Sequence, residues 1–168
     1  MSFIQTDIKQ LNENMIGMIS KDWMLLSAGT PEGYNEMTVS WGGLGFLWNE
    51  PVATVYVRPQ RYTDQFLKNN NTFSLCVFDE QYRDMLRKAG AISGKDCNKT
   101  AQLGLSPIFE DGTVYFEQAR LVFICEKLYT DKFLPQNFEK PETLEKYYPE
   151  KDYHNIYIGA IKKVFYKT

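Results

Sequence analysis

The sequence has few of the residues that build metal centres and disulfide frameworks. It contains one histidine, His154, and three cysteines. The cysteines are odd in number and widely spaced, so they form neither a C-x-x-C metal-ligand pattern nor a set of paired bridges. We therefore expect no metal site and a reducing compartment.

The sequence also lacks an excess of basic charge and any long apolar run. Its net charge of −2 argues against the broad basic surface of a nucleic-acid-binding protein. No stretch is long enough to cross a bilayer, and the first residues do not show the basic region and apolar run of an export signal. We expect a cytoplasmic protein that binds neither nucleic acid nor membrane.

A third absence is the G-x-G-x-x-G motif after a strand, which holds dinucleotides on a Rossmann fold. Its absence argues against a doubly wound parallel sheet. A nicotinamide cofactor would then bind only as a transient substrate.

What the sequence does contain is a series of short β patterns. Several segments alternate β-branched or aromatic residues with others and are bounded by turn residues, which is typical of strands. One of them, 113–129, is long enough for a bent strand or a hairpin. The predicted strands are 23–26, 37–41, 51–57, 72–78, 113–129 and 155–166.

Short helices are predicted between these strands. Residues 62–68, 81–91 and 96–104 have the residue types of helices, with Asp96 as the N-cap of the third. Many short strands with a few small helices favour a mainly β protein built as an antiparallel barrel. The length of 168 residues fits one compact domain.

One segment differs from the rest of this single predicted domain. Residues 130–151 are rich in proline, charge and tyrosine. They show no apolar period beyond a turn of helix at 142–147, so we expect a surface excursion from the barrel.

Two segments concentrate groups that suit an anion. N-E-M-T-V-S-W-G-G begins at Asn35, and R-P-Q-R-Y-T begins at Arg58. Arg58 and Arg61 are candidates for a phosphate site, because guanidinium groups can bind phosphate through paired hydrogen bonds. Thr63, at the start of a predicted helix, adds a hydroxyl and a backbone N–H. Without further context, such arginines on a turn are usually just solvated.

The same segments offer surfaces for a conjugated ring. Trp41 and Tyr62 present flat faces, and the amide of Asn35 can donate and accept hydrogen bonds at a polar ring edge. Thr38 and Ser40 would share one face of a strand because side chains alternate. Together with the arginines, these residues indicate a phosphorylated aromatic cofactor, although a turn asparagine and a core tryptophan are the ordinary alternatives.

With Ser93-Gly94-Lys95-Asp96 and Lys99 further on, these motifs resemble the flavin reductase-like, FMN-binding split-barrel family, in particular its flavoredoxin-like branch. Tyr153-His154, followed by Tyr157-Ile158-Gly159, is similar to the C-terminal signature of that branch. The resemblance implies an antiparallel split β-barrel of Greek-key type. It also implies bound FMN and a homodimer with the flavin near the two-fold interface.

The resemblance further implies roles for individual residues. Asn35, Trp41 and the backbone near Ser40 would contact the flavin ring, while the Arg58/Arg61/Thr63 group would hold the phosphate. Lys99 would be a second cation near the phosphate or ribityl chain. His154 would contact the flavin and is the candidate proton donor; no other catalytic residue is assigned. The predicted cofactor-binding residues are Asn35, Met37, Thr38, Val39, Ser40, Trp41, Arg58, Arg61, Tyr62, Thr63, Ser93, Lys95, Lys99 and His154.

Two positions depart from the family pattern. Glu36 stands where a small hydroxyl residue is more common, and Cys97 where a small aliphatic residue is common. We expect Glu36 to point to solvent.

The implied activity is that of an NAD(P)H-dependent flavin reductase. NADH or NADPH would be the transient substrate, and electrons would pass to free flavin or to a redox partner protein. Two alternatives stay open: an electron carrier that holds FMN tightly and never meets a nicotinamide, and a ligand-binding module without redox function.

Overall fold

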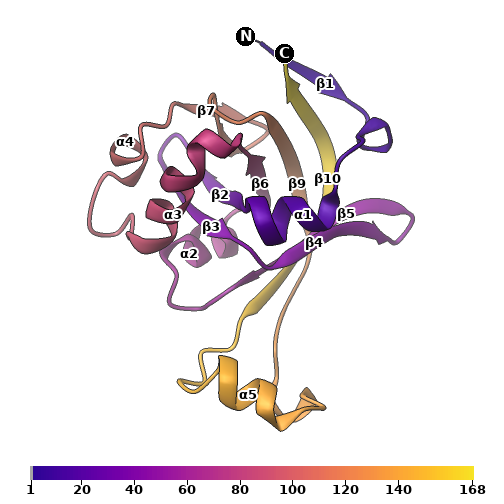
Figure 1. Cartoon of the computed structure of the whole chain (residues 1–168), viewed down its shortest axis with the longest axis vertical. Coiled ribbons are helices and arrows are strands. Elements are labelled where there is room, and N and C mark those ends of the chain that lie inside the picture. Colours follow the sequence, from indigo (N-terminus) through magenta and orange to yellow (C-terminus); the bar gives the residue numbers. More distant parts are fainter. Residues whose placement is uncertain (1) are drawn as a thin grey trace.

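The structure is a computed structural model that describes residues 2–168 (Figure 1). Antiparallel sheet is its main regular structure, which confirms the predicted mainly β fold. The strands are β1 (Phe3–Thr6), β2 (Met24–Thr30), β3 (Gly33–Val39), β4 (Gly42–Leu47), β5 (Glu50–Val57), β6 (Thr72–Val77), β7 (Pro107–Glu110), β8 (Thr113–Phe116), β9 (Leu121–Lys132) and β10 (Asn155–Lys167).

The helices are short and lie between strands. None of them, within residues 2–168, is long and apolar enough to cross a membrane. The α-helices are α1 (Met15–Gly17), α2 (Tyr62–Asn69), α3 (Arg83–Ala91), α4 (Lys99–Gln102) and α5 (Pro141–Tyr147). Single turns of 3₁₀ or π-helix occur at Ile8–Gln10, Met18–Asp22, Glu80–Tyr82 and Pro135–Asn137.

The main sheet has the order β3-β2-β6-β9-β10-β5-β4, with β1 also pairing with β10. Its two end strands, β3 and β4, are consecutive in the chain. Only Ser40 and Trp41 connect them, and such a connector spans at most about 11 Å. The two ends of the sheet therefore meet at this corner, which curves the sheet toward a barrel.

Alternate residues of the strands pack into two separate cores. On β2, Leu26 belongs to one core and Leu25 to the other, and on β6 Leu75 and Cys76 divide in the same way. This follows from the two-residue period of a strand. The second core is completed by α3, through Leu86, and by the β7–β8 ribbon. Strands β2 and β6 are thus buried on both faces.

Several predicted elements differ from the observed ones. The predicted strand 113–129 is two strands, β8 and β9, that pair with different partners. The predicted helix 96–104 contains only the four residues of α4, and Asn98, not Asp96, caps it by accepting from the Ala101 N–H at 3.2 Å. Strand β4 was not predicted, because its sequence GGLGFL is rich in glycine, which is depleted in strands.

Between β9 and β10 the chain leaves the barrel, and we call residues 133–154 the arm. In Figure 1 the arm, with α5, lies beyond the end of the barrel that is opposite the two termini. Its aromatic rings pack on one another, with Tyr148 5.6 Å from Phe138 and 5.2 Å from Tyr153. The predicted excursion 130–151 begins inside β9, since that strand continues to Lys132.

Candidate functional site

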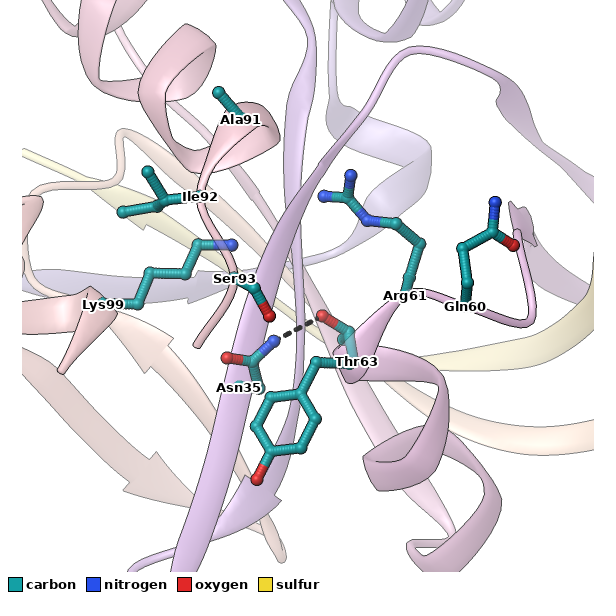
Figure 2. Close-up of a pocket in the computed structure, with 9 residues that line it drawn as sticks. Asn35, Gln60, Arg61, Thr63, Ala91, Ile92, Ser93 and Lys99 are labelled. Carbon is teal, nitrogen blue, oxygen red and sulfur yellow. Dashed lines mark hydrogen bonds between the residues drawn. The ribbon is translucent and has the colours of Figure 1, made fainter. Parts of the chain in front are cut away.

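Two neighbouring hollows share Arg61 as a lining residue. We name them the Lys99 hollow, of about 170 Å³, and the Trp41 hollow, of about 210 Å³. The Lys99 hollow (Figure 2) is lined by Asn35, Gln60, Arg61, Tyr62, Thr63, Ala91, Ile92, Ser93 and Lys99. The Trp41 hollow is lined by Met37, Thr38, Val39, Ser40, Trp41, Tyr56, Arg58, Arg61 and His154.

These linings contain every predicted cofactor-binding residue except Lys95. They come together because β3 and the corner after it run along both hollows, while the first turn of α2 and the end of α3 meet above β3. Each hollow is smaller than the roughly 300–1,000 Å³ of usual ligand pockets. A ligand the size of a nucleotide would therefore have to occupy both.

Asn35 is held firmly at the floor of the Lys99 hollow. It is buried, and its Nδ2 donates to Thr63 Oγ1 at 2.7 Å (Figure 2). A Cβ on Gly94 would lie 1.9 Å from Asn35 Oδ1, so only glycine fits against this amide. The side chain is thus fixed between α2 and the loop at Ser93.

Lys99 and Arg61 enter this hollow from opposite sides (Figure 2). Lys99 is buried, and its Nζ donates to the Glu36 carbonyl oxygen at 2.6 Å. Burial, reinforced by Arg61 and opposed by Glu36, lowers the pKa of Lys99 to about 8. Burial also lowers the pKa of Arg61, whose Nη1 donates to the Gly90 carbonyl oxygen at 3.0 Å. Two desolvated cations at one hollow favour an anionic ligand.

The amino end of α2 faces the same hollow through Tyr62 and Thr63. Its N-cap residue, Arg61, makes no side-chain capping bond. The first-turn N–H groups of a helix lack partners within the helix and carry a partial positive charge. This end therefore adds to the positive potential of the two side chains.

The expectation for Glu36 was wrong. Its side chain is 1% exposed, and its two carboxylate oxygens accept from Thr100 Oγ1 at 3.3 and 3.2 Å. Burial raises the pKa of this carboxyl, an effect that Lys99 and Thr100 reduce. The reason is tertiary: α4 packs on β3 and covers the side chain that the strand pattern alone would leave in solvent.

The two predicted phosphate arginines lie in different surroundings. Arg58 forms an ion pair with Asp152, donates to the Tyr147 carbonyl oxygen at 2.8 Å and lies over the Tyr148 ring. All three partners belong to the arm. Arg58 lines only the Trp41 hollow, so the structure does not bring it to Thr63 and Lys99.

Trp41 is a surface residue at the corner between β3 and β4, with 46% of its area exposed. Its ring lies 5.6 Å from that of Tyr147 and 5.4 Å from that of His154. Trp41 is therefore outside the core and lines the hollow. Trp48 is also outside the core, because it is 60% exposed at the tip of the β4–β5 hairpin.

Side chains next to Trp41 are less available than their types suggest. The Thr38 hydroxyl donates to the Leu86 carbonyl oxygen at 2.5 Å and ties β3 to α3. Met37 and Val39 belong to the barrel core. In this part of β3, the backbone remains for a ligand, since β3 is an end strand paired only with β2 within residues 2–168.

His154 is buried, and its Nδ1 lies 2.7 Å from the Tyr148 hydroxyl. Burial and the nearby Arg58 lower the pKa of His154 to about 4, although Asp152 acts in the other direction. The ring is therefore uncharged at neutral pH. An imidazolium that donates a proton, as the sequence suggested, is not the resting state of this residue.

Sequence reasoning missed Gln60 and Tyr56, which also line the hollows. Gln60 lies between the two arginines of the motif and donates to Asp152 at 2.7 Å, so its position in the motif was an available signal. Tyr56 carried no such signal. Its ring is placed by the arm, through a 5.3 Å contact with Phe133.

None of the three cysteines lines either hollow. All three are free thiols, and only Cys97 is not fully buried. Residues 2–168 hold no group of three His, Cys, Asp or Glu side chains that could bind a metal ion.

The structure thus combines an antiparallel barrel with a cationic hollow beside an aromatic one. Residues 16–168 match the family described as "Flavin reductase like domain", and the chain belongs to this family. No curated protein sequence matches the chain.

Solved structures share the split-barrel fold at low sequence identity. An FMN-binding domain of a flavin reductases-like enzyme from Shewanella baltica has 15% identity and a TM-score of 0.70, over 98% of this chain and 77% of its own. Flavoredoxin from Methanosarcina acetivorans has 17% identity and a TM-score of 0.70, over 96% and 76%. An NADH:FAD oxidoreductase from Streptomyces globisporus, in complex with NAD and FAD fragments, has 13% identity and a TM-score of 0.65, over 87% and 74%.

Proposed function

We propose that this protein binds FMN across the two hollows and is an NAD(P)H-dependent flavin reductase, which passes electrons to free flavin or to a redox partner protein. The observation that carries the proposal is the position of Arg61 between a hollow with a second buried cation and a hollow walled by Trp41 and His154. A phosphate and a conjugated ring at the two ends of one molecule match this arrangement. Relatives whose structures are described as binding FMN, NAD or FAD support it.

The Lys99 hollow would hold the phosphate. Arg61 offers a guanidinium fork, Lys99 an ammonium group, and Thr63 a hydroxyl and a backbone N–H at the start of α2. Both cations are desolvated, so they lose little further hydration when an anion enters. The residues present therefore fit a phosphate monoester.

The Trp41 hollow would hold the ring. The outer edge of β3 can supply backbone N–H and C=O groups to the polar half of a flavin, and Trp41 borders its apolar part. When bound, FMN would supply the hydride- and electron-transfer chemistry. The protein's part is to orient the ring and leave one face open to a second ring, which requires neither a metal nor a catalytic triad.

Anaerobic titration of the FMN-loaded protein with NADH, and then with NADPH, tests this function. We expect the visible flavin absorption to bleach at catalytic rates with at least one of them. A flavin that only dithionite reduces would instead identify an electron carrier. Failure of the purified and the FMN-reconstituted protein to hold flavin would contradict the proposal.

FMN affinity is expected to fall as the pH rises above 8. Without ligand, Lys99 titrates near pH 8, and a phosphate dianion would raise that pKa. Below pH 8 the cation is present before binding. At a pH between the Lys99 pKa of the free protein and the higher Lys99 pKa of the complex, binding of FMN must be accompanied by uptake of a proton. In this range the FMN affinity falls by up to about tenfold per pH unit. Fluorescence titrations measure this.

Riboflavin and Lys99→Met are the controls for this pH dependence. Riboflavin lacks the phosphate, so its weaker affinity should change little around pH 8. Lys99→Met should bind FMN more weakly and lose the pH dependence. An FMN affinity that stays constant through pH 8 in the unchanged protein would place the phosphate away from Lys99.

We also propose a homodimer. Phe46 on β4, Trp48 at the hairpin tip and Tyr129 on β9 are 67%, 60% and 43% exposed. Trp48 and Tyr129 lie 6.4 Å apart, beside β4, an end strand of the sheet. Large exposed apolar side chains beside an open strand edge are typical of a protein interface. Light scattering after size-exclusion chromatography would refute this if only monomer eluted.

A further inference from the structure

The two ring nitrogens of His154 have different surroundings. Nδ1 lies 2.7 Å from the Tyr148 hydroxyl oxygen. Nε2 has no hydrogen-bond partner within residues 2–168, and it is not among the fully enclosed polar atoms that lack one. Because the ring lines the Trp41 hollow, Nε2 is the nitrogen that a ligand in this hollow can reach.

The Tyr148 hydroxyl must be the donor in this bond. Tyr148 is 5% exposed, and its hydroxyl makes no other hydrogen bond within residues 2–168. If Nδ1 carried a proton and donated it, the hydroxyl proton would be left without an acceptor in a buried position, which is unfavourable. Burial raises the pKa of Tyr148, so the hydroxyl keeps its proton. Nδ1 therefore accepts, and the ring proton resides on Nε2.

Burial and the nearby Arg58 favour the neutral ring, while Asp152 acts in the other direction. The Arg58 guanidinium lies over the Tyr148 ring at 5.2 Å and is paired with Asp152. The other neighbours of the imidazole are aromatic: Trp41 at 5.4 Å, Phe133 at 6.5 Å and the Tyr148 ring at 5.6 Å. A second positive charge between Arg58 and these rings would be poorly solvated.

We propose that Tyr148 is a positioning residue that holds His154 as the neutral Nε2–H tautomer, and that this N–H is a hydrogen-bond donor to a carbonyl oxygen or ring nitrogen of the ligand in the Trp41 hollow. The identity of that ligand as FMN rests on the proposed function. The tautomer does not. His154 thus acts as a donor that stays protonated at Nε2, and it transfers no proton.

This assignment gives the arm a role in the site. Tyr148 follows α5, and its ring is packed against Phe138 and Tyr153, also from the arm. The aromatic cluster therefore sets the position of one hydroxyl, which in turn sets the orientation of His154.

Nuclear magnetic resonance of untagged protein labelled with ¹⁵N-histidine tests the tautomer directly, since His154 is the only histidine. We expect the wild-type correlation spectrum at neutral pH to show one neutral Nε2–H ring. In Tyr148→Phe the spectrum should change to a mixture of both tautomers. Tyr153→Phe is the matched control, because its hydroxyl does not contact His154, and its spectrum should match the wild type.

An Nδ1–H ring in the wild type would overturn the assignment, as would a Tyr148→Phe spectrum identical to that of the wild type. The wild-type spectrum decides the tautomer even if Tyr148→Phe does not fold. Addition of FMN tests the proposed hydrogen bond from Nε2–H to the ligand. We expect the Nε2–H resonance to shift when FMN binds. If fluorescence shows FMN bound while that resonance stays in place, the donor role fails and the proposed function stands. If no FMN binds, the FMN-binding function and the flavin as acceptor fail together, and the tautomer result stands.

Discussion

Arg61→Ala is expected to weaken FMN binding by roughly 10- to 150-fold, the equivalent of about 1.5–3 kcal/mol for hydrogen bonds to a charged group. Arg61 lines both hollows, and it is partly desolvated before any ligand binds. The variant would lose the hydrogen bonds that the Arg61 guanidinium can donate to the phosphate. Flavin-fluorescence titration measures the loss.

Arg58→Ala provides the matched comparison, since it removes an identical group three residues earlier in the same motif. The Arg58 guanidinium is already engaged by Asp152 and the Tyr147 carbonyl, so we expect a smaller loss of FMN affinity. Riboflavin binding should be almost insensitive to Arg61→Ala. Equal losses for the two variants, or a riboflavin loss as large as the FMN loss, would show that Arg61 does not hold the phosphate.

Gly42→Ala is expected to lower the free energy of unfolding by about 2–5 kcal/mol, from backbone strain and overpacking together. Gly42 has φ 141°, a conformation that side chains disfavour, and a Cβ there would lie 2.3 Å from the Thr54 carbonyl oxygen. That oxygen belongs to the adjacent strand β5, so β4 would have to separate from β5 just after the corner that carries Trp41. Urea denaturation measures the change.

Gly43→Ala is the control for this prediction. A Cβ at Gly43 would meet no atom within 4 Å, and its φ is not in the left-handed region. We expect a change within about 0.5 kcal/mol. Similar unfolding midpoints for the two variants would mean that the corner tolerates a side chain and that its geometry does not depend on Gly42.

The β patterns were readable because alternation and turn residues are local properties. Strands β5, β6 and β10 and helices α2 and α3 lie where the sequence predicts them. Strand β4 was missed because pairing with β5, and not the preference of its glycines, makes it a strand. The short α4 depends in the same way on packing against β3.

The residue types of the candidate site could also be predicted from the sequence motifs. Arg61, Thr63 and Lys99 line one hollow, as the motifs suggested, but Asn35, which was expected at the ring, lines the same hollow. Lys95 does not line it and lies on the loop before α4. Spacing in the motif could not tell which of two nearby lysines turns inward.

By itself, the sequence determined the mainly β architecture, the family resemblance and the set of groups suited to a phosphate and a ring. Only the tertiary structure decided which of those groups are available. It pairs the Arg58 guanidinium with Asp152 and buries Glu36. It also lowers the pKa of Lys99 and leaves His154 uncharged beside Tyr148. The reason is physical: desolvation and hydrogen-bond partners come from segments far apart in the chain, and they set the charge and reach of a side chain as much as its type does.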